Sequence, residues 1–149
     1  MASRFVLLDT GILGMVTHPK GNNDAKTWLQ KLLAAGTIVF IPEICDYEIR
    51  RELLRAGKTY SIIRLDTLKT KLRYLPINTN TMLKAAEFWA ETRKRGMPTT
   101  DDKSLDADVI LAAQANVLSG VTGVNPVIAT TNVRHLSRFG QAELWWSVI

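Results

Sequence analysis

The sequence predicts an α/β protein, a three-layer sandwich with a mainly parallel central sheet of about five strands flanked by helices. Two observations lead to this prediction. Short apolar runs alternate along the chain with longer segments in which apolar residues recur at helical spacing. Strands that alternate with helices pair in parallel, because each helix returns the chain to the starting edge of the sheet. No repeat or low-complexity tract interrupts the 149 residues, so we expect one domain over 1–149.

The expected strands are short and apolar. Arg4 to Leu8 is an apolar run closed by Asp-Thr-Gly, which predicts a buried strand that enters a turn. Thr37 to Ile41 is β-branched and aromatic and predicts a second buried strand. Three further strands are expected at residues 74–77, 126–129 and 144–148.

The segments between the strands carry helix signals. Asp24 is a suitable N-cap for a helix that ends at Gly36, and Pro42 opens a helix that runs to about Ala56. Further helices are expected over residues 60–72, 80–94 and 106–118, shorter ones at 12–16 and 133–139, and a surface loop at 98–104. The small apolar residues of 106–118 indicate a closely packed inner helix.

Composition narrows the class of protein. A hydrophobic content of 46% with 22% charged residues argues against disorder. The net charge of +5 favours an anionic partner such as RNA or DNA, although a basic surface also serves solubility alone. The single cysteine, Cys45, forms no internal disulfide and is expected to be a small buried residue. Because no signal peptide and no apolar run near 18 residues is present, we expect a cytoplasmic protein without a membrane segment.

Four acidic or amide residues follow apolar runs. Asp9 ends the first strand, and Asn132 lies just beyond the strand near residue 129. Glu48 follows the second strand by about two helical turns, and Asp108 falls in the first turn or so of its helix, where the helix dipole tolerates an anion. Since ligands in open α/β sheets gather beyond the carboxyl ends of the strands, we expect the four to share one site.

Three carboxylates in one place repel one another and raise a pKa unless a cation is present. Mg²⁺ or Mn²⁺ suits this all-oxygen set better than zinc, since the chain has two histidines and no cysteine cluster. A metal held in this way can activate water and stabilise the leaving oxygen of a phosphodiester.

Each of these residues also has a simpler structural interpretation. Asp9 alone is equally well explained as a turn or cap residue, and Glu48 alone is more often a solvated helix charge paired with Arg51. Asp106 and Asp108 stand two residues apart on one expected helix, and their side chains point to different faces of it. At most one of them therefore belongs to the site, while the other caps the helix or supports the site.

Amide and hydroxyl residues have open alternatives too. Asn132 is suited to cap a following helix, a role that is compatible with a place in the site. Thr10 and Thr130 either orient a carboxylate or a metal-bound water, or simply occupy strand ends.

Taken in order, four segments of the chain resemble the motifs of the PIN domain and, within it, of the VapC-like toxins of bacterial toxin–antitoxin pairs. The segments are Val6-Leu-Leu-Asp-Thr-Gly-Ile-Leu, Pro42-Glu-Ile-Cys-Asp-Tyr-Glu-Ile, Asp108-Val-Ile-Leu-Ala-Ala-Gln-Ala and Ala129-Thr-Thr-Asn-Val-Arg-His-Leu. The resemblance selects Glu48 over Glu43 and Glu52, and Asp108 over Asp106. In the last motif Asn132 stands where many members have Asp, and His135-Leu136 replaces an acidic-aromatic pair.

The resemblance implies an endoribonuclease that depends on Mg²⁺ or Mn²⁺, forms a homodimer and is inhibited by a cognate antitoxin. It implies catalytic roles for Asp9, Glu48, Asp108 and Asn132, with the three carboxylates as metal ligands. The arginines that we consider for RNA phosphate contacts are Arg50, Arg51, Arg93, Arg95 and Arg134, although most of them are also explained as solvated helix charges. The missing fourth acid motivates an alternative: a PIN-fold module that binds RNA or a protein without cutting.

Overall fold

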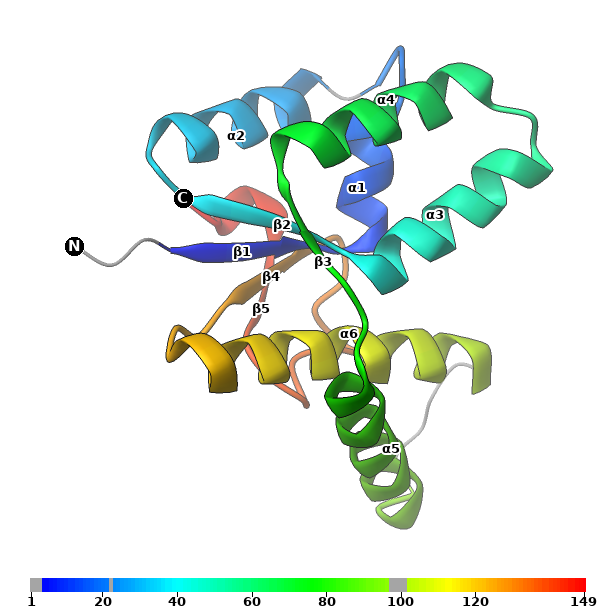
Figure 1. Ribbon diagram of the computed structural model, residues 1–149, viewed down its shortest axis with the longest axis vertical. Helices are drawn as coiled ribbons and strands as arrows, with labels where there is room; N and C mark the ends of the chain where they lie inside the picture. The colour runs from blue at the N-terminus through cyan, green and yellow to red at the C-terminus, as the bar shows by residue number, and fades with distance from the viewer. Residues whose placement is uncertain (1–3, 22, 97–101) are drawn as a thin grey trace.

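In the part of the chain that the structure describes, five strands lie in one parallel sheet with the order β3-β2-β1-β4-β5 (Figure 1). The computed structural model describes residues 4–21, 23–96 and 102–149, with backbone alone over 102–104. The strands are β1 (Phe5–Leu8), β2 (Ile38–Pro42), β3 (Arg73–Leu75), β4 (Val127–Thr130) and β5 (Ala142–Leu144). The predicted parallel α/β sheet is therefore confirmed.

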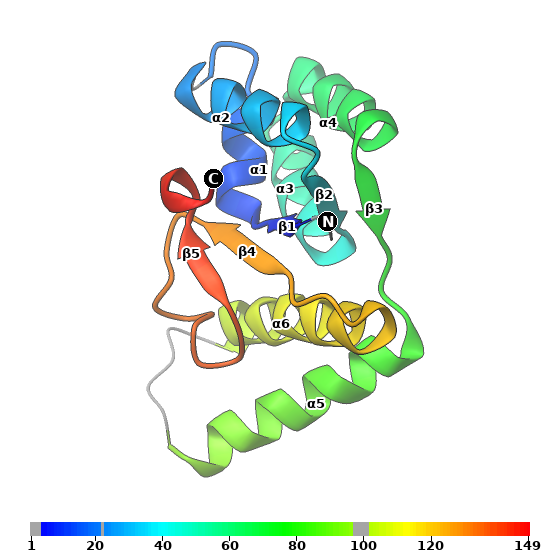
Figure 2. The ribbon, with the colours of Figure 1, turned by 90° about the vertical axis from the view of Figure 1, so that its left-hand side faces the viewer.

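Helices cover both faces of the sheet (Figures 1 and 2). One layer holds α1 (Thr10–Thr17), α2 (Asn23–Ala34), α3 (Glu43–Arg55) and α4 (Thr59–Lys71). On the other face α6 (Asp102–Thr122) lies against the sheet, and α5 (Thr79–Lys94) packs on α6. The three-layer sandwich is confirmed as well.

The strand order places a topological switch point between β1 and β4. From β1 the chain builds outward through β2 to β3, and then crosses to the other side of β1 to form β4 and β5. Val6 of β1 consequently has Val39 of β2 on one side and Val127 of β4 on the other. The segments that leave β1 and β4 diverge here, and such a switch point is where open α/β sheets bind ligands.

Burial explains why the central strand is apolar throughout. Val6, Leu7 and Leu8 have no exposed surface, because helices cover both faces of β1. Each such side chain contributes about 1.5–3 kcal/mol through its removal from water. The strand that carries Asp9 at its end is thus rigidly held in the core.

Two glycines end helices as the sequence predicts. Gly36 follows α2 with φ +84°, and Gly57 follows α3 with φ +67°. The backbone amide of Lys58 then donates to the Leu53 carbonyl at 2.9 Å and closes the last turn of α3. A side chain with a Cβ would be strained at this φ, which accounts for glycine.

The structure corrects several predicted boundaries. Residues 102–104, expected in a loop, belong to α6, whereas 97–101 lie outside the described residues. Because α6 starts early, Asp108 is six residues beyond its first residue and not in its first turn. Residues 134–139 form consecutive turns and not the expected short helix, so Asn132 caps no helix. Residues 145–147, expected in a strand, form a 3₁₀ turn, and α2 starts at Asn23, so Asp24 is not its N-cap.

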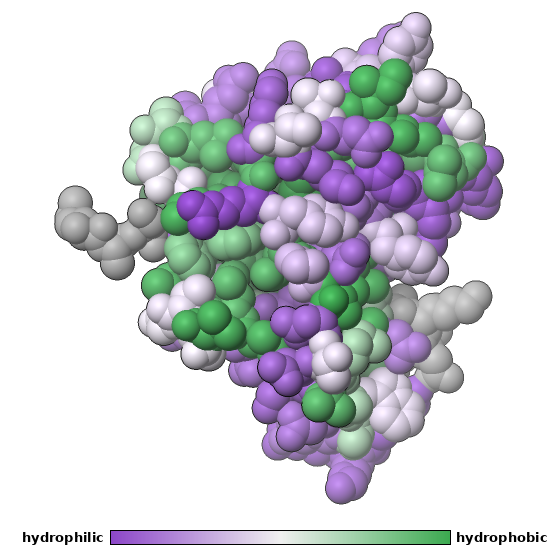
Figure 3. Space-filling view, in the orientation of Figure 1, coloured by the Kyte–Doolittle hydropathy of each residue, from purple (hydrophilic) through white to green (hydrophobic). Residues whose placement is uncertain are grey.

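Exposed hydrophobic residues gather where α3 meets α4 (Figure 3). Leu54, Tyr60 and Ile63 are among the large exposed side chains there. A groove of about 700 Å³ runs beside them and is lined on one side by His18, which follows α1. This groove lies at the opposite end of α1 from Asp9. No helix in the described ranges is both long and apolar enough to cross a membrane.

Candidate active site

Asp9 occupies the first position after β1 and is fixed by contacts to two other segments. Its backbone amide donates to the Ala129 carbonyl at 3.0 Å, which extends the pairing of β1 with β4. Its Oδ1 accepts the Thr10 amide at 2.7 Å, and its Oδ2 accepts the Thr130 hydroxyl at 2.5 Å. Asp9 is therefore the N-cap of α1 and also points toward the end of β4.

Glu48 projects from the second turn of α3 toward the same place. Its Oε1 accepts the Thr10 hydroxyl at 2.8 Å, so one threonine contacts both carboxylates, Asp9 through its amide and Glu48 through its side chain. On the outer side, Arg51 Nη2 lies 4.0 Å from Glu48 Oε2. The other two glutamates of α3 have other partners: Glu43 accepts the Ile77 amide and Glu52 binds Arg55.

Asp108 completes the set from the opposite layer. Burial raises the pKa of its carboxyl to about 7, and the negative charges of Asp9 and Glu48 add to this rise, while Arg138 opposes it. Because Asp9 and Glu48 act electrostatically on Asp108, the three carboxylates lie in one neighbourhood. Asp106, in contrast, is exposed and lines a groove between α5 and α6 with Met82 and Trp89.

The other two carboxyls also have raised pKa values. Burial raises the pKa of Asp9, and the hydrogen bonds from Thr130 and the Thr10 backbone oppose the rise. Burial likewise raises the pKa of Glu48; the charge of Asp9 adds to this effect, while Thr10 and Arg51 oppose it. Every carboxyl of the cluster thus resists ionisation, chiefly because it is buried.

At the end of β4, a threonine and an asparagine have different roles. Thr130 is completely buried, and its hydroxyl bonds Asp9 and also accepts the backbone amide of Asn132 at 3.1 Å. Asn132 is exposed, and its Oδ1 accepts the Arg134 amide at 3.1 Å. The Asn132 side chain thus stabilises a turn just outside the cluster.

Gly11 permits the close approach of α1 to the segment after β4. A Cβ at Gly11 would lie 2.6 Å from the Thr131 hydroxyl oxygen, closer than side-chain carbons approach in proteins. Glycine here allows the first turn of α1 to meet the residue that follows Thr130. The Asp-Thr-Gly sequence therefore serves packing as well as the carboxylate.

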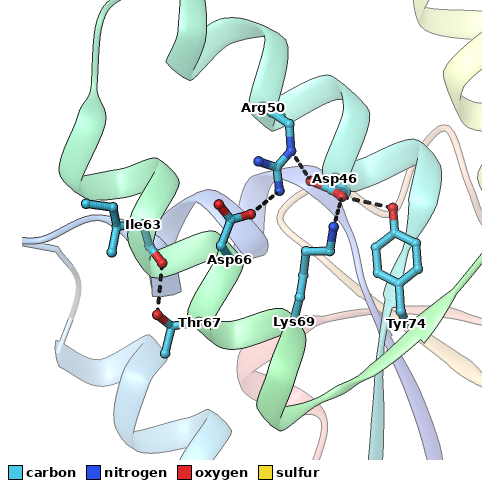
Figure 4. A network of polar contacts seen from close by, with 7 residues as sticks. All are labelled: Asp46, Arg50, Ile63, Asp66, Thr67, Lys69 and Tyr74. Atoms are coloured by element: carbon cyan, nitrogen blue, oxygen red, sulfur yellow. Dashed lines mark hydrogen bonds and ion pairs between the residues drawn. The ribbon is translucent and has the colours of Figure 1, made fainter.

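A polar network holds α3, the helix that carries Glu48, against α4 and β3 (Figure 4). Asp46, which is buried, accepts hydrogen bonds from Tyr74 Oη at 2.8 Å and Arg50 Nε at 2.9 Å, and pairs with Lys69 Nζ at 3.2 Å. Arg50 also binds Asp66 at 2.8 Å. Burial opposes ionisation of Asp46, but these partners outweigh it and lower the pKa.

Gln114 joins the two helical layers behind the cluster. It is 1% exposed on α6, its Nε2 donates to the Leu75 carbonyl at 2.7 Å, and its Oε1 accepts the Ile44 amide at 3.3 Å. Gln114 therefore fixes the helix of Asp108 relative to that of Glu48. No sequence pattern predicts this contact, since a glutamine inside an apolar helix carries no motif of its own.

The five arginines considered for phosphate contacts lie in different surroundings. Arg51 is beside Glu48, whereas Arg50 is engaged in the network of Asp46. Arg93 and Arg95 lie at the C-terminal end of α5, where Arg93 covers the ring of Trp89 and Arg95 binds Glu91. Arg134 is exposed two residues after Asn132. Arg138, which the sequence analysis overlooked, acts electrostatically on Asp108.

The donor atoms of the cluster are suited to a hard cation, although the side chains do not form a complete cage. In the described ranges no group of three or more His, Cys, Asp and Glu side chains is arranged to hold a metal ion directly. Mg²⁺ keeps several of its waters in proteins and often binds through only one or two carboxylates. An all-oxygen cluster of mutually repelling acids fits such a partly hydrated ion.

Comparison with solved structures shows the same fold. The structure of VapBC2 from Rickettsia felis, which is bound to a promoter DNA fragment, matches with a TM-score of 0.75 and 19% identity. The match covers 95% of this chain and 98% of that chain. FitAcB from Neisseria gonorrhoeae matches with a TM-score of 0.72 and 20% identity over 96% and 99%. VapBC-1 from nontypeable Haemophilus influenzae matches with a TM-score of 0.67 and 20% identity over 95% and 98%.

No protein-family model and no curated protein sequence matches the chain. At about one identical residue in five, the likeness to solved structures establishes the fold. The PIN-like fold that the four motifs indicated is confirmed.

Proposed function

We propose that this protein is a metal-dependent endoribonuclease that hydrolyses RNA phosphodiester bonds and acts as the toxin of a toxin–antitoxin pair. The observation that carries the proposal is the grouping of three partly buried carboxyls, Asp9, Glu48 and Asp108, in which burial, together with the charges of Asp9 and Glu48, raises the pKa of Asp108 to about 7. A cluster of this kind ionises readily only when a cation neutralises it. The switch-point location and the likeness to the VapBC and FitAcB folds support the same conclusion.

Each residue of the site has a defined part in this proposal. Asp9, Glu48 and Asp108 would hold Mg²⁺ or Mn²⁺, which when bound lowers the pKa of water and stabilises the leaving oxygen of a phosphodiester. Thr130 and Thr10 hold the carboxylates of Asp9 and Glu48 in fixed directions. Asn132 would add a neutral oxygen at the outer edge of the site.

Positive charge on both sides of the carboxylates favours an anionic substrate. Arg51 lies beside Glu48, and Arg138 acts on Asp108. Guanidinium groups make paired hydrogen bonds to phosphate oxygens, so these side chains would attract and orient the RNA backbone. The net charge of +5 supports association with a polyanion.

An endonuclease of this kind needs restraint inside a cell. We therefore include in the proposal a cognate antitoxin that covers the active-site groove, a homodimeric state and a cytoplasmic location, as the family resemblance implies. The VapBC and FitAcB neighbours support the antitoxin partner. Co-expression with the product of the adjacent reading frame, followed by co-purification, tests this part.

RNA cleavage tests the catalytic part. The purified protein is incubated with labelled single-stranded RNA in Mg²⁺, in Mn²⁺ and in excess chelator. We expect cleavage only with metal, and loss of at least about 100-fold in rate for Asp9→Asn and Glu48→Gln. Glu52→Gln is the matched control, because Glu52 lies one helical turn from Glu48 and binds Arg55. Cleavage that survives Asp9→Asn would refute the assignment.

A second function is favoured by one observation. Asn132 stands where many PIN domains have an acid, which weakens the case for chemistry and leaves a module that binds RNA or a protein without cutting. Titrating Mn²⁺ in a calorimeter separates the two functions, because a catalytic site takes up the metal. Undetectable heat together with tight RNA binding would favour the module.

A further inference from the structure

Tyr47 is a large aromatic residue that remains exposed beside the carboxylate cluster. It precedes Glu48 on α3, and 56% of its surface is accessible to solvent. The guanidinium carbon of Arg51 lies 5.1 Å from the centre of its ring. One face of the ring is therefore covered by a cation, while much of the side chain faces water.

The same guanidinium joins Tyr47 to the site. Arg51 is one helical turn from both residues, and its Nη2 lies 4.0 Å from Glu48 Oε2. A positive charge and an exposed ring are thus arranged side by side at the edge of the cluster.

The corresponding pair on the Asp108 side is built differently. Arg138 lies 5.8 Å from the ring of Phe139, but this ring packs at 5.3 Å against Phe88 within a small apolar cluster. Lys69 and Tyr74 also form a cation–π pair, but both are engaged with Asp46. Among these three pairs, Tyr47 and Arg51 combine nearness to the carboxylates with an accessible ring.

We propose that Tyr47 and Arg51 form a subsite for one unpaired nucleotide, in which the Tyr47 ring stacks on the base and Arg51 contacts the adjoining phosphate. The inference rests on the proposed nuclease function and names its substrate class as single-stranded RNA. An aromatic ring accepts any base on its face, and a guanidinium binds phosphate through two N–H groups. Bases in a duplex are stacked on their neighbours and offer no free face, so this subsite selects unpaired RNA.

Binding of a short fluorescein-labelled single-stranded RNA, followed by fluorescence anisotropy, tests the subsite. Measurements use full-length Asp9→Asn protein, so that cleavage does not interfere. We expect Tyr47→Ala to weaken binding by roughly 5- to 140-fold, the equivalent of one lost base stack. Tyr47→Phe keeps the ring and should bind within about twofold of the parent. Tyr60→Ala, which removes a ring that is 76% exposed on α4, is the matched control and should bind like the parent.

A duplex of the same RNA separates stacking from general charge attraction. We expect Tyr47→Ala to leave duplex binding unchanged, whereas Arg51→Ala weakens the binding of both forms. Equal effects of Tyr47→Ala and Tyr60→Ala, or equal weakening of single-stranded and duplex binding by Tyr47→Ala, would overturn the subsite. Melting curves of each variant verify that the exposed substitutions preserve the fold.

Cleavage kinetics distinguish failure of the subsite from failure of the proposed function. In the active protein, Tyr47→Ala should raise KM and change kcat by no more than about twofold. Normal cleavage by Tyr47→Ala with an unchanged KM would refute the subsite and leave the nuclease proposal intact. Tyr47-dependent binding by a wild-type protein that cuts no RNA would refute the nuclease and retain the subsite.

Discussion

The hydroxyl of Thr130 donates a hydrogen bond of 2.5 Å to Oδ2 of Asp9, and this contact joins residues 121 positions apart in the sequence. Thr130 ends β4 and is completely buried, so no water replaces the donor. The Thr10 amide binds the other oxygen of Asp9. The direction of the Asp9 carboxylate is thus set by two segments that lie far apart in the sequence.

Thr130→Val removes the hydroxyl but keeps the shape of the side chain. We expect a loss of about 1.5–3 kcal/mol in the free energy of unfolding, since the lost hydrogen bond goes to a charged group. Urea denaturation measures this loss, and Thr130→Ser, which keeps the donor, is the control. In an Asp9→Asn background the loss should shrink, because the charge is gone. An equal loss in both backgrounds would show that Thr130 acts through packing alone.

Asp108 should make the stability of the metal-free protein depend on pH. Its pKa is about 7 in the folded protein and about 3.9 when unfolded, so the folded state holds the proton more tightly. This contribution to stability is fully present below about pH 4 and is lost as the pH rises through 7. Asp108→Asn carries no charge and should therefore exceed the wild type in stability at pH 8, by about 1–2 kcal/mol after solvent screening of a partly exposed group.

Thermal melting in chelator between pH 4 and pH 8 measures this effect. The difference in stability between Asp108→Asn and the wild type should grow as the pH rises. Asp106→Asn, two residues away on the exposed side of α6, should show no such growth. A constant difference across the pH range would contradict the raised pKa of Asp108.

Tyr74 should stabilise the fold through its bond to Asp46. Tyr74→Phe keeps the ring but leaves one oxygen of a buried carboxylate without its 2.8 Å hydrogen bond. We expect a loss of about 1–2 kcal/mol in unfolding free energy, moderated because Arg50 and Lys69 still bind Asp46. Urea denaturation checks the value, with Tyr60→Phe as control. A stability equal to the wild type would mean that Tyr74 adds nothing to the network that orients α3.

The sequence predicted the sheet well because its signals were local. Phe5 to Leu8 is apolar without alternation, as a strand covered on both faces requires, and glycines with positive φ end helices where expected. The order and spacing of the motifs singled out Asp9, Glu48 and Asp108, which the structure places in electrostatic contact. The apolar strand, the glycines at helix ends and each motif are recognised from neighbouring residues, without knowledge of distant contacts.

The errors arose where the spacing of apolar residues does not decide the structure. Residues 133–139 have helix-like apolar spacing but form successive turns, in which Leu136 is 2% exposed. The Asn132 side chain accepts the Arg134 amide at the start of these turns. Residues 102–104 are polar and lie before the apolar period that marks α6 in the sequence, which starts at Leu105. The contact of Gln114 with β3 and α3 was equally invisible, because its partners are backbone atoms.

The most direct test of the carboxylate site is the effect of Mn²⁺ on melting temperature. At roughly 100 times its dissociation constant, a metal that binds only the folded protein adds about 2.7 kcal/mol, or roughly 5–10 °C for a chain of this size. We predict this shift for the wild type and for Asp106→Asn, and its loss in Asp9→Asn and Asp108→Asn. A wild-type protein that melts at the same temperature with and without Mn²⁺, or an Asp108→Asn variant that keeps the full shift, would contradict the metal site.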